Sequence, residues 1–174
     1  MRWPADLDPA LLRQPDARSC GAASVLAARA LLTGWRPDPD GAAEEILDEH
    51  RMLTSSRSPR DRWQAPWPRR LGTPPWALAN ALRVLTGRHL ATVSARPRPA
   101  IAYEVLRAQL QDRPVLVYLG NRWLPRHVVV AVAAEPDGIC VFDPAHGRLV
   151  RVPAENWRGH RVGVAGWTHL WFVI

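Results

Sequence analysis

The residues best suited to chemistry in this chain are a cysteine, a histidine and an aspartate spread along its length. Cys20 lies in the stretch RQPDARSCGAAS, where a loop runs into an apolar segment with the composition of a helix. The first turn of a helix presents unpaired N–H groups and the positive end of the helix dipole, and both favour a thiolate over a thiol. Cys20 is therefore a candidate nucleophile, although free cysteine is also among the most commonly buried residues.

Three further side chains complete a candidate catalytic set. His127 precedes the apolar run VVVAVAA at the expected entrance of a strand, and Asp143 ends the next run, GICVFD, just before a proline. Gln14 lies six residues before Cys20 on the same loop and has an amide N–H that can stabilise an oxyanion. Each residue alone also has an ordinary explanation: a tolerated polar residue at a strand end, a turn starter before proline, or a loop glutamine.

In this order, the four residues resemble the papain-like cysteine peptidases, most closely the C39-like branch related to domains that process bacteriocin leaders. The 6-residue spacing of Gln14 and Cys20 and the 16-residue spacing of His127 and Asp143 are similar to that pattern. The segments GTPPWALANALRVLTG and LQDRPVLVYLGNRWLPRHVVVAV resemble the family's helix between nucleophile and base and its strands around the histidine. Ser19 departs from the aspartate of many C39-type domains. The transporter fused to bacteriocin-processing members is absent here, so cleavage after a double-glycine leader is not implied.

The resemblance implies a role for each residue. Cys20 is the expected nucleophile, and His127 is the base that deprotonates it and later protonates the leaving group. Asp143 is expected to orient His127, while Gln14 and the backbone N–H of Cys20 form the oxyanion hole. The implied fold is α+β and papain-like, with N-terminal helices packed on a C-terminal antiparallel sheet in one domain, residues 1–174. The implied activity is hydrolysis of a peptide or isopeptide bond through a thioester acyl-enzyme, with a peptide or protein substrate and no cofactor.

Two alternatives stay open. The same thioester supports acyl or amide transfer, including glutamine deamidation and transglutamination. All 23 basic residues of the chain are arginine, so an enzyme that joins glutamine to lysine would not join to itself. The other alternative is a non-enzymatic binding module that uses the Arg- and Trp-rich segment 54–76.

The positive charge of the chain is concentrated in residues 51–98. The net charge is +7, and this segment has ten arginines against one acidic residue, Asp61, whereas the remainder has thirteen arginines and fifteen acidic residues. Its first part has the Pro, Ser and Gly content of a long loop. An acidic peptide, a nucleic acid or an anionic membrane surface would be attracted to it. A solvated basic surface that reflects a G+C-rich bacterial genome is the alternative.

Helical patterns come first along the chain and extended patterns follow, which favours the segregated α+β class. Ser19 is the expected N-cap of the first helix, and Gly34 and Gly87 are expected to end two helices. Helices are predicted over residues 20–32, 41–50, 74–86 and 100–112, and strands over 89–95, 114–119, 127–134, 138–143, 148–152 and 169–174.

The hairpin between the histidine and aspartate strands tests whether these two residues meet. With a two-residue turn at 136–137, Asp143 lies opposite Val130 and faces away from His127. A five-residue loop at 133–137 places Asp143 opposite His127, while a three-residue turn with a bulge leaves both on one face but well apart. We expect the five-residue register, or a bulge that restores it.

Other features limit the classes of protein to consider. No apolar run reaches the roughly 18 to 20 residues of a spanning helix, and the first residues do not have the pattern of a secretory signal, so we expect a cytoplasmic location. Two cysteines make a disulfide framework improbable, and Cys140 is expected to be a core thiol on the face opposite Asp143. The other histidines show no metal-ligand spacing, so no metal is assigned, although His146 lies close enough to Asp143 to line the site. No feature indicates the oligomeric state.

Overall fold

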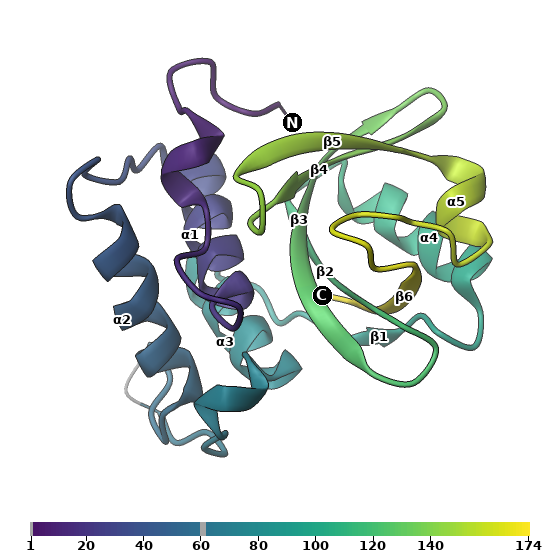
Figure 1. The fold of residues 1–174 in the computed structure, drawn as a ribbon. Coiled ribbons are helices and arrows are strands. Elements are labelled where there is room, and N and C mark those ends of the chain that lie inside the picture. The colour runs from purple at the N-terminus through teal and green to yellow at the C-terminus, as the bar shows by residue number, and fades with distance from the viewer. Residues whose placement is uncertain (1, 60–61) are drawn as a thin grey trace.

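The first half of the chain forms a layer of three helices packed side by side (Figure 1). The structure, a computed structural model, describes residues 2–59 and 62–174; Asp61, the acidic residue of the basic segment 51–98, and its neighbour Arg60 lie outside the described residues. The helices of this layer are α1 (Cys20–Thr33), α2 (Ala42–Thr54) and α3 (Pro75–Thr86), with the short 3-10 helices η1 (Pro9–Leu12) and η2 (Arg69–Leu71) in the connecting loops.

The second half forms a six-stranded antiparallel sheet with the strand order β1-β6-β2-β3-β4-β5. Its strands are β1 (Val93–Ser94), β2 (Val115–Gly120), β3 (Pro125–Glu135), β4 (Gly138–Asp143), β5 (Arg148–Pro153) and β6 (His169–Val173). Two further helices, α4 (Pro99–Gln109) and α5 (Ala154–Arg158), lie on the side of the sheet away from α1 (Figure 1). The expected α+β class, with helices packed on an antiparallel sheet, is confirmed.

Alternation along the strands gives the sheet two buried faces. Val128 and Val130 of β3 belong to the core shared with α1, α2 and α3. Val129 and Ala131, which point the other way, belong to the core under α4 and α5, where Trp157 is fully buried. Because the central strands are covered on both faces, they are nearly continuous apolar runs rather than alternating ones.

The helix ends follow the expected chemistry except at one cap. Gly34 and Gly87 end α1 and α3 in the left-handed conformation, with φ of 73° and 69°. Ser19 occupies the N-cap position of α1, but its side chain makes no capping hydrogen bond.

Several predicted boundaries were wrong. The helix predicted over 41–50 continues to Thr54, because the apolar spacing persists through Met52 and Leu53. The strand predicted over 89–95 shrinks to Val93–Ser94. The five-residue helix α5 was missed because it is too short to show a helical period.

Between the end of α2 and the start of α3, the described residues of the Arg- and Trp-rich segment 54–76 form a loop that contains η2, as its composition predicts, and hydrogen bonds fix their path. The side-chain amide nitrogen of Gln64 is buried and lies 3.3 Å and 3.2 Å from the carbonyl oxygens of Leu53 and Ser55. The indole N–H of Trp76 donates to the carbonyl of Ala65 at 3.0 Å. After η2 the chain passes the N-terminus of α1, where Thr73 lies against Gly21, and then enters α3.

None of the helices in the described part of the chain is long and apolar enough to cross a membrane.

Candidate active site

Cys20 is the first residue of α1 and is 5% exposed. The loop before it is shaped by Asp16, whose carboxylate accepts hydrogen bonds from the backbone N–H groups of Arg18 and Ser19, each at 2.8 Å. Asp16 thus holds the loop in position for the start of the helix. Its signal in the sequence, an aspartate three residues before the N-cap position, was missed.

The first turn of α1 approaches the loop after η2 very closely. A Cβ atom on Gly21 would lie 2.6 Å from the Cβ and Oγ1 atoms of Thr73, so a glycine is required beside Cys20. The carbonyl of Thr73 accepts a hydrogen bond of 2.6 Å from the hydroxyl of Tyr118 on β2. Burial, and then the negative charge at Cys20, raise the pKa of the Tyr118 hydroxyl well above its usual value. Tyr118 therefore stays neutral and supports the wall beside the thiol.

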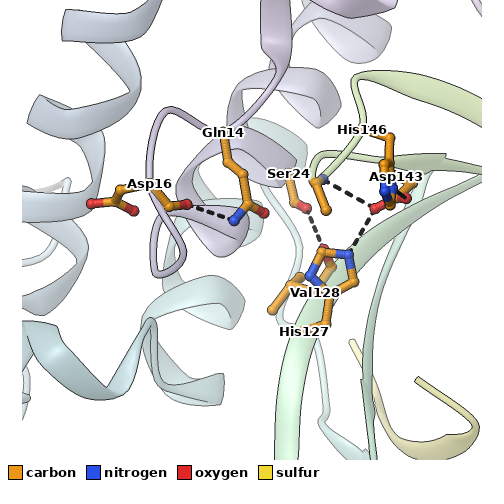
Figure 2. Close-up of polar contacts among 8 residues, drawn as sticks. Gln14, Asp16, Ser24, His127, Val128, Asp143 and His146 are labelled. Atoms are coloured by element: carbon orange, nitrogen blue, oxygen red, sulfur yellow. Dashed lines mark hydrogen bonds and ion pairs between the residues drawn. The ribbon is translucent and has the colours of Figure 1, made fainter. Parts of the chain in front are cut away.

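His127 lies near the start of β3 and contacts both Asp143 and Cys20. Its Nε2 atom is 2.8 Å from Oδ1 of Asp143, and both residues are buried (Figure 2). Burial by itself lowers the pKa of His127, but hydrogen bonds with Asp143 and Cys20 outweigh it and raise this pKa to about 9. Because Asp143 occupies Nε2, Nδ1 is the ring nitrogen left for Cys20. At neutral pH the ring is therefore an imidazolium between two acidic groups.

A β-bulge brings His127 and Asp143 onto one face of the sheet. The hairpin closes with a two-residue turn, Glu135 pairing with Gly138, so the predicted five-residue loop was wrong. The register then shifts at Val132, which has no partner in β4, so a bulge is present. With Val130 paired to Phe142, this bulge does not restore the register in which Asp143 lies opposite His127, so the second option was also wrong. The shifted register was expected to leave the two residues well apart, yet diagonal neighbours in a sheet are within reach of a long side chain such as histidine.

Asp143 receives hydrogen bonds from three donors. Besides His127, these are the ring Nδ1 of His146 on Oδ2 at 2.6 Å and the backbone N–H of Ala145 on Oδ1 at 3.0 Å (Figure 2). Burial raises the pKa of this carboxyl, but the hydrogen bonds from the two histidines and Ala145 outweigh it and hold the pKa below its usual value. Asp143 is therefore a carboxylate shared by one buried and one half-exposed histidine.

Gln14 is held beside the turn that follows Asp143, but its side chain is engaged elsewhere. Its backbone N–H donates to the carbonyl of Pro144 at 2.8 Å. Its amide Nε2 donates to the carbonyl of Asp16 at 2.6 Å, as Figure 2 shows, and Gln14 does not line the cleft around Cys20. An amide NH₂ has two hydrogens, so one N–H of Gln14 is not used by this bond.

Cys20 and His127 line an open cleft of about 470 Å³. One wall is formed by the loop before α1 and the end of the Arg- and Trp-rich segment, and the other by the start of β3. Among the tryptophans, Trp167 lines this cleft, whereas Trp63 and Trp123 do not. The full lining is Ala17, Arg18, Cys20, Arg70, Leu71, Gly72, Thr73, Tyr118, Asn121, Pro125, Arg126, His127, Val128 and Trp167.

One buried hydrogen bond joins the helix of Cys20 to the strand of His127. The hydroxyl of Ser24, one turn along α1, donates to the carbonyl of Val128 at 3.2 Å (Figure 2). Ser24 is fully buried, so its hydroxyl has no water to replace this partner. The bond fixes the distance between the two elements next to the cleft.

Cys140 has no part in this site. It is a free thiol that is only partly buried, so the expected core position was wrong. Burial, together with the charge of Glu135, raises the pKa of its thiol. Within residues 2–59 and 62–174, no group of three or more histidine, cysteine or acidic side chains is arranged to hold a metal ion.

Comparison with known proteins identifies the fold. No protein-family model and no curated protein matches the chain. Among solved structures, the chain is similar to the peptidase domain of Streptococcus ComA, a bifunctional ABC transporter involved in a quorum-sensing pathway. The likeness covers 93% of each chain with a TM-score of 0.52 and 20% sequence identity. The chain therefore has the fold of a papain-like, C39-like peptidase domain, and the resemblance stated from its sequence is confirmed at the level of the fold.

Proposed function

We propose that the protein is a cysteine peptidase-type hydrolase that cleaves a peptide or isopeptide bond. The observation that carries this proposal is the position of His127, which is hydrogen-bonded to Asp143 and lines an open cleft of a peptidase fold together with Cys20. A histidine oriented by a carboxylate and in contact with a thiol is the arrangement that activates a nucleophile.

In the first half of the reaction, the Cys20 thiolate attacks the carbonyl carbon of the substrate. The imidazolium of His127 then gives its proton to the amide nitrogen, the C–N bond breaks and the amine leaves. The acyl group of the substrate stays on Cys20 as a thioester. Asp143 keeps Nε2 of His127 occupied, so that Nδ1 stays directed at the thiol and the leaving group. The buried carboxylate also stabilises the positive ring between the steps.

In the second half, His127 removes a proton from water, whose oxygen attacks the thioester. The carboxylic acid product leaves and the Cys20 thiolate and the imidazolium are restored. The negative oxygen of each tetrahedral intermediate needs N–H donors. We assign them to the backbone N–H of Cys20, at the free end of α1, and to the unused N–H of Gln14.

The same thioester can be attacked by an amine instead of water, and an attack on a glutamine side chain releases ammonia. Acyl transfer and glutamine deamidation therefore remain alternatives that the masses of the products distinguish. Hydrolysis of a peptide bond adds 18 Da across the two products, while deamidation leaves the chain intact. A binding module without activity is the remaining alternative.

The proposal is tested by cleavage profiling on a mixed peptide library with mass spectrometry of the products. We expect new termini with wild-type protein and none with the Cys20→Ala and His127→Ala proteins. Cys140→Ala is the matched control and should retain full activity, because Cys140 lies outside the cleft. Cleavage that persists in Cys20→Ala, or a folded wild type that leaves every peptide unchanged, would contradict the proposal.

We place the enzyme in a reducing compartment such as the cytoplasm, because Cys20 must stay a free thiol.

A further inference from the structure

Three arginines line the cleft around Cys20, and no acidic residue within 2–59 and 62–174 does. Arg18 comes from the loop before α1, Arg70 from η2 and Arg126 from the start of β3, next to His127. All three residues are exposed. In the part of the chain that the structure describes, none of them forms an ion pair. Their guanidinium groups therefore have donors to offer to a molecule in the cleft.

Six other arginines of the described residues form ion pairs with carboxylates. Those with an acidic partner are Arg29, Arg36, Arg51, Arg88, Arg151 and Arg158, and none of them lines the cleft. Among the described residues, other arginines without an acidic partner occur on this surface, Arg98 among them, so what distinguishes the cleft is that three such residues from separate segments line it together. Charged groups of one sign on the walls of a cleft focus the field into it.

Two acidic residues lie close to this cleft, Asp143 behind His127 and Asp16 on the loop that carries Arg18. Asp16 lies beside Arg18, but its carboxylate accepts backbone N–H groups on the helix-start loop. It faces a neighbouring hollow that is lined also by Arg51 and Arg69. The carboxylates of Asp16 and Asp143 are thus engaged by hydrogen bonds, while the described residues offer no acidic ion-pair partner to Arg18, Arg70 or Arg126.

We propose that the substrate of this site is an acidic peptide segment, with aspartate or glutamate side chains flanking the bond that is cleaved. This inference rests on the proposed peptidase function and names its substrate class. A guanidinium group binds a carboxylate through two parallel, charge-assisted hydrogen bonds. A neutral amide or hydroxyl side chain of a substrate would bind the same guanidinium group more weakly. Because the three arginines come from three segments around Cys20, acidic residues on both sides of the scissile bond contribute to binding.

The charge of the cleft is tested first without any substrate, by alkylation of Cys20 in Cys140→Ser protein. The probes are iodoacetate, which is an anion, and iodoacetamide, which is neutral and of similar size. The quantity measured is the rate constant for iodoacetate divided by that for iodoacetamide. We expect this ratio to fall in each of the single variants Arg18→Gln, Arg70→Gln and Arg126→Gln, and to fall on the order of tenfold in the triple variant. In the wild type, about 1 M salt should lower this ratio, because the Debye length is then only about 3 Å and the charges of the cleft are screened.

The matched control is Arg98→Gln. Arg98 is an exposed arginine at the start of α4, outside the cleft. Its replacement changes the net charge by the same amount as each single variant of the cleft arginines. It should leave the ratio unchanged. An unchanged ratio in the triple cleft variant, or an equal fall in Arg98→Gln, would overturn the inference. Circular dichroism of each variant verifies that these exposed substitutions leave the fold intact.

The second arm uses pairs of peptides that differ only in Asp or Glu against Asn or Gln around each cleaved bond. We expect higher kcat/KM for the acidic member, a gain that disappears in the triple variant and at high salt. Arg126→Glu should shift the preference toward peptides with arginine at the same positions. Cleavage without any charge preference would overturn the substrate class while leaving the peptidase function in place.

The two proposals fail in different ways. If no peptide is cleaved, the peptidase function fails, and the iodoacetate to iodoacetamide ratio still decides whether the cleft selects anions. A short single-stranded oligonucleotide serves as a competitor of iodoacetate alongside a glutamate-rich peptide. Protection of Cys20 by the oligonucleotide at much lower concentration than by the peptide would overturn the assignment of an acidic peptide in favour of nucleic acid.

Discussion

At the scale of single residues, the site depends on how one carboxylate is shared. Asp143 is fully buried and bonds to His127 on one oxygen and His146 on the other. Burial alone would favour its neutral form, which could not stabilise an imidazolium. The hydrogen bonds reverse this effect and keep the pKa of Asp143 low. We therefore expect His146 to be a positioning residue that acts on His127 through Asp143.

Replacement of His146 should shift the pH dependence of activity. His146→Ala removes a hydrogen bond that lowers the pKa of Asp143, so this pKa rises and the acid limb of kcat/KM moves to higher pH. The shift is moderated because His146 is 48% exposed and solvent screens it. His89→Ala, at an exposed histidine outside the cleft, should leave the limb in place. A His146→Ala profile that coincides with the wild type would show that His127 and Ala145 suffice.

Gln14 provides the second test at this scale. If its free N–H stabilises the oxyanion, Gln14→Ala should lower kcat about 100- to 1,000-fold with little change in KM. Gln14→Glu, which keeps the size but removes the donors, should lose as much. The side chain binds Asp16 in the unliganded site, so the alternative is a purely structural role. In that case both variants would lower thermal stability and leave kcat within a few-fold of the wild type.

At the scale of elements, the site depends on how α1, which carries Cys20, is placed relative to β3, which carries His127. Each element is specified by its own pattern, but the distance between them is fixed by contacts across the interface. Ser24 makes the hydrogen bond that joins them, and Gly21 allows α1 to approach Thr73. In the sequence, Gly21 belongs to the Cys-Gly pair at the helix start, but nothing marks Ser24 for this contact.

Loss of the Ser24 hydroxyl should weaken both the fold and the reaction. Ser24→Ala leaves the buried carbonyl of Val128 without this donor, and we expect a loss of about 1 kcal/mol in the free energy of unfolding. The greater freedom between α1 and β3 should lower kcat more than KM. Urea denaturation and steady-state kinetics measure the two effects. Ser94→Ala, at an exposed serine of β1, is the control and should change neither. Unchanged kcat in a destabilised Ser24→Ala protein would contradict the positioning role.

The helical layer contains a carboxyl group that works against stability. Glu49 lines a small hollow among α1, α2 and α3 together with Val25, Met52 and Ala81. Burial raises the pKa of Glu49 to about 7; the charge of Arg29 opposes this shift and that of Glu45 adds to it. The folded protein therefore prefers the neutral carboxyl and loses stability as pH rises from about 4.5 to about 7.

Glu49→Gln keeps the shape of this side chain without its charge. We expect the variant to be more stable than the wild type at pH 8, on the order of 2 kcal/mol, and equal to it below about pH 4.5. The check is the difference in Tm or urea midpoint measured across this pH range. Glu44→Gln, on the exposed side of α2, should show no such trend. A Glu49→Gln protein that is less stable at pH 8 would mean that the carboxylate makes a favourable interaction.

At the scale of the whole molecule, the sequence predicts more of the fold than of the geometry of the site. The order of helices and strands follows from their periods, and the ends of α1 and α3 follow from Gly34 and Gly87. The meeting of His127 with Asp143 does not follow, because it depends on a bulge at Val132 inside an apolar run. Any residue of that run has a similar preference for a strand, so nothing local marks the one that goes unpaired.

The residues that line the cleft could not be predicted from the sequence either. Trp167 and Tyr118 reach it from strands and loops far along the chain from Cys20. The basic segment 51–98 was recognised by its charge, but only the folded chain brings Arg70 from that segment beside Arg18 and Arg126. Contacts between distant segments are set by the packing of the two layers and not by local composition.

Whether Cys20 is an activated nucleophile is tested most directly by its rate of alkylation with iodoacetamide as a function of pH. The pKa of His127 is raised to about 9, so the imidazolium that pairs with a thiolate is present at neutral pH and is lost as pH rises through 9. Wild-type Cys20, followed by peptide mass, should react rapidly well below pH 8, and His127→Ala should abolish this fast phase. If Cys20 reacts in both proteins like a simple thiol with a pKa near about 8.5, or only after unfolding, Cys20 is not the nucleophile of a peptidase.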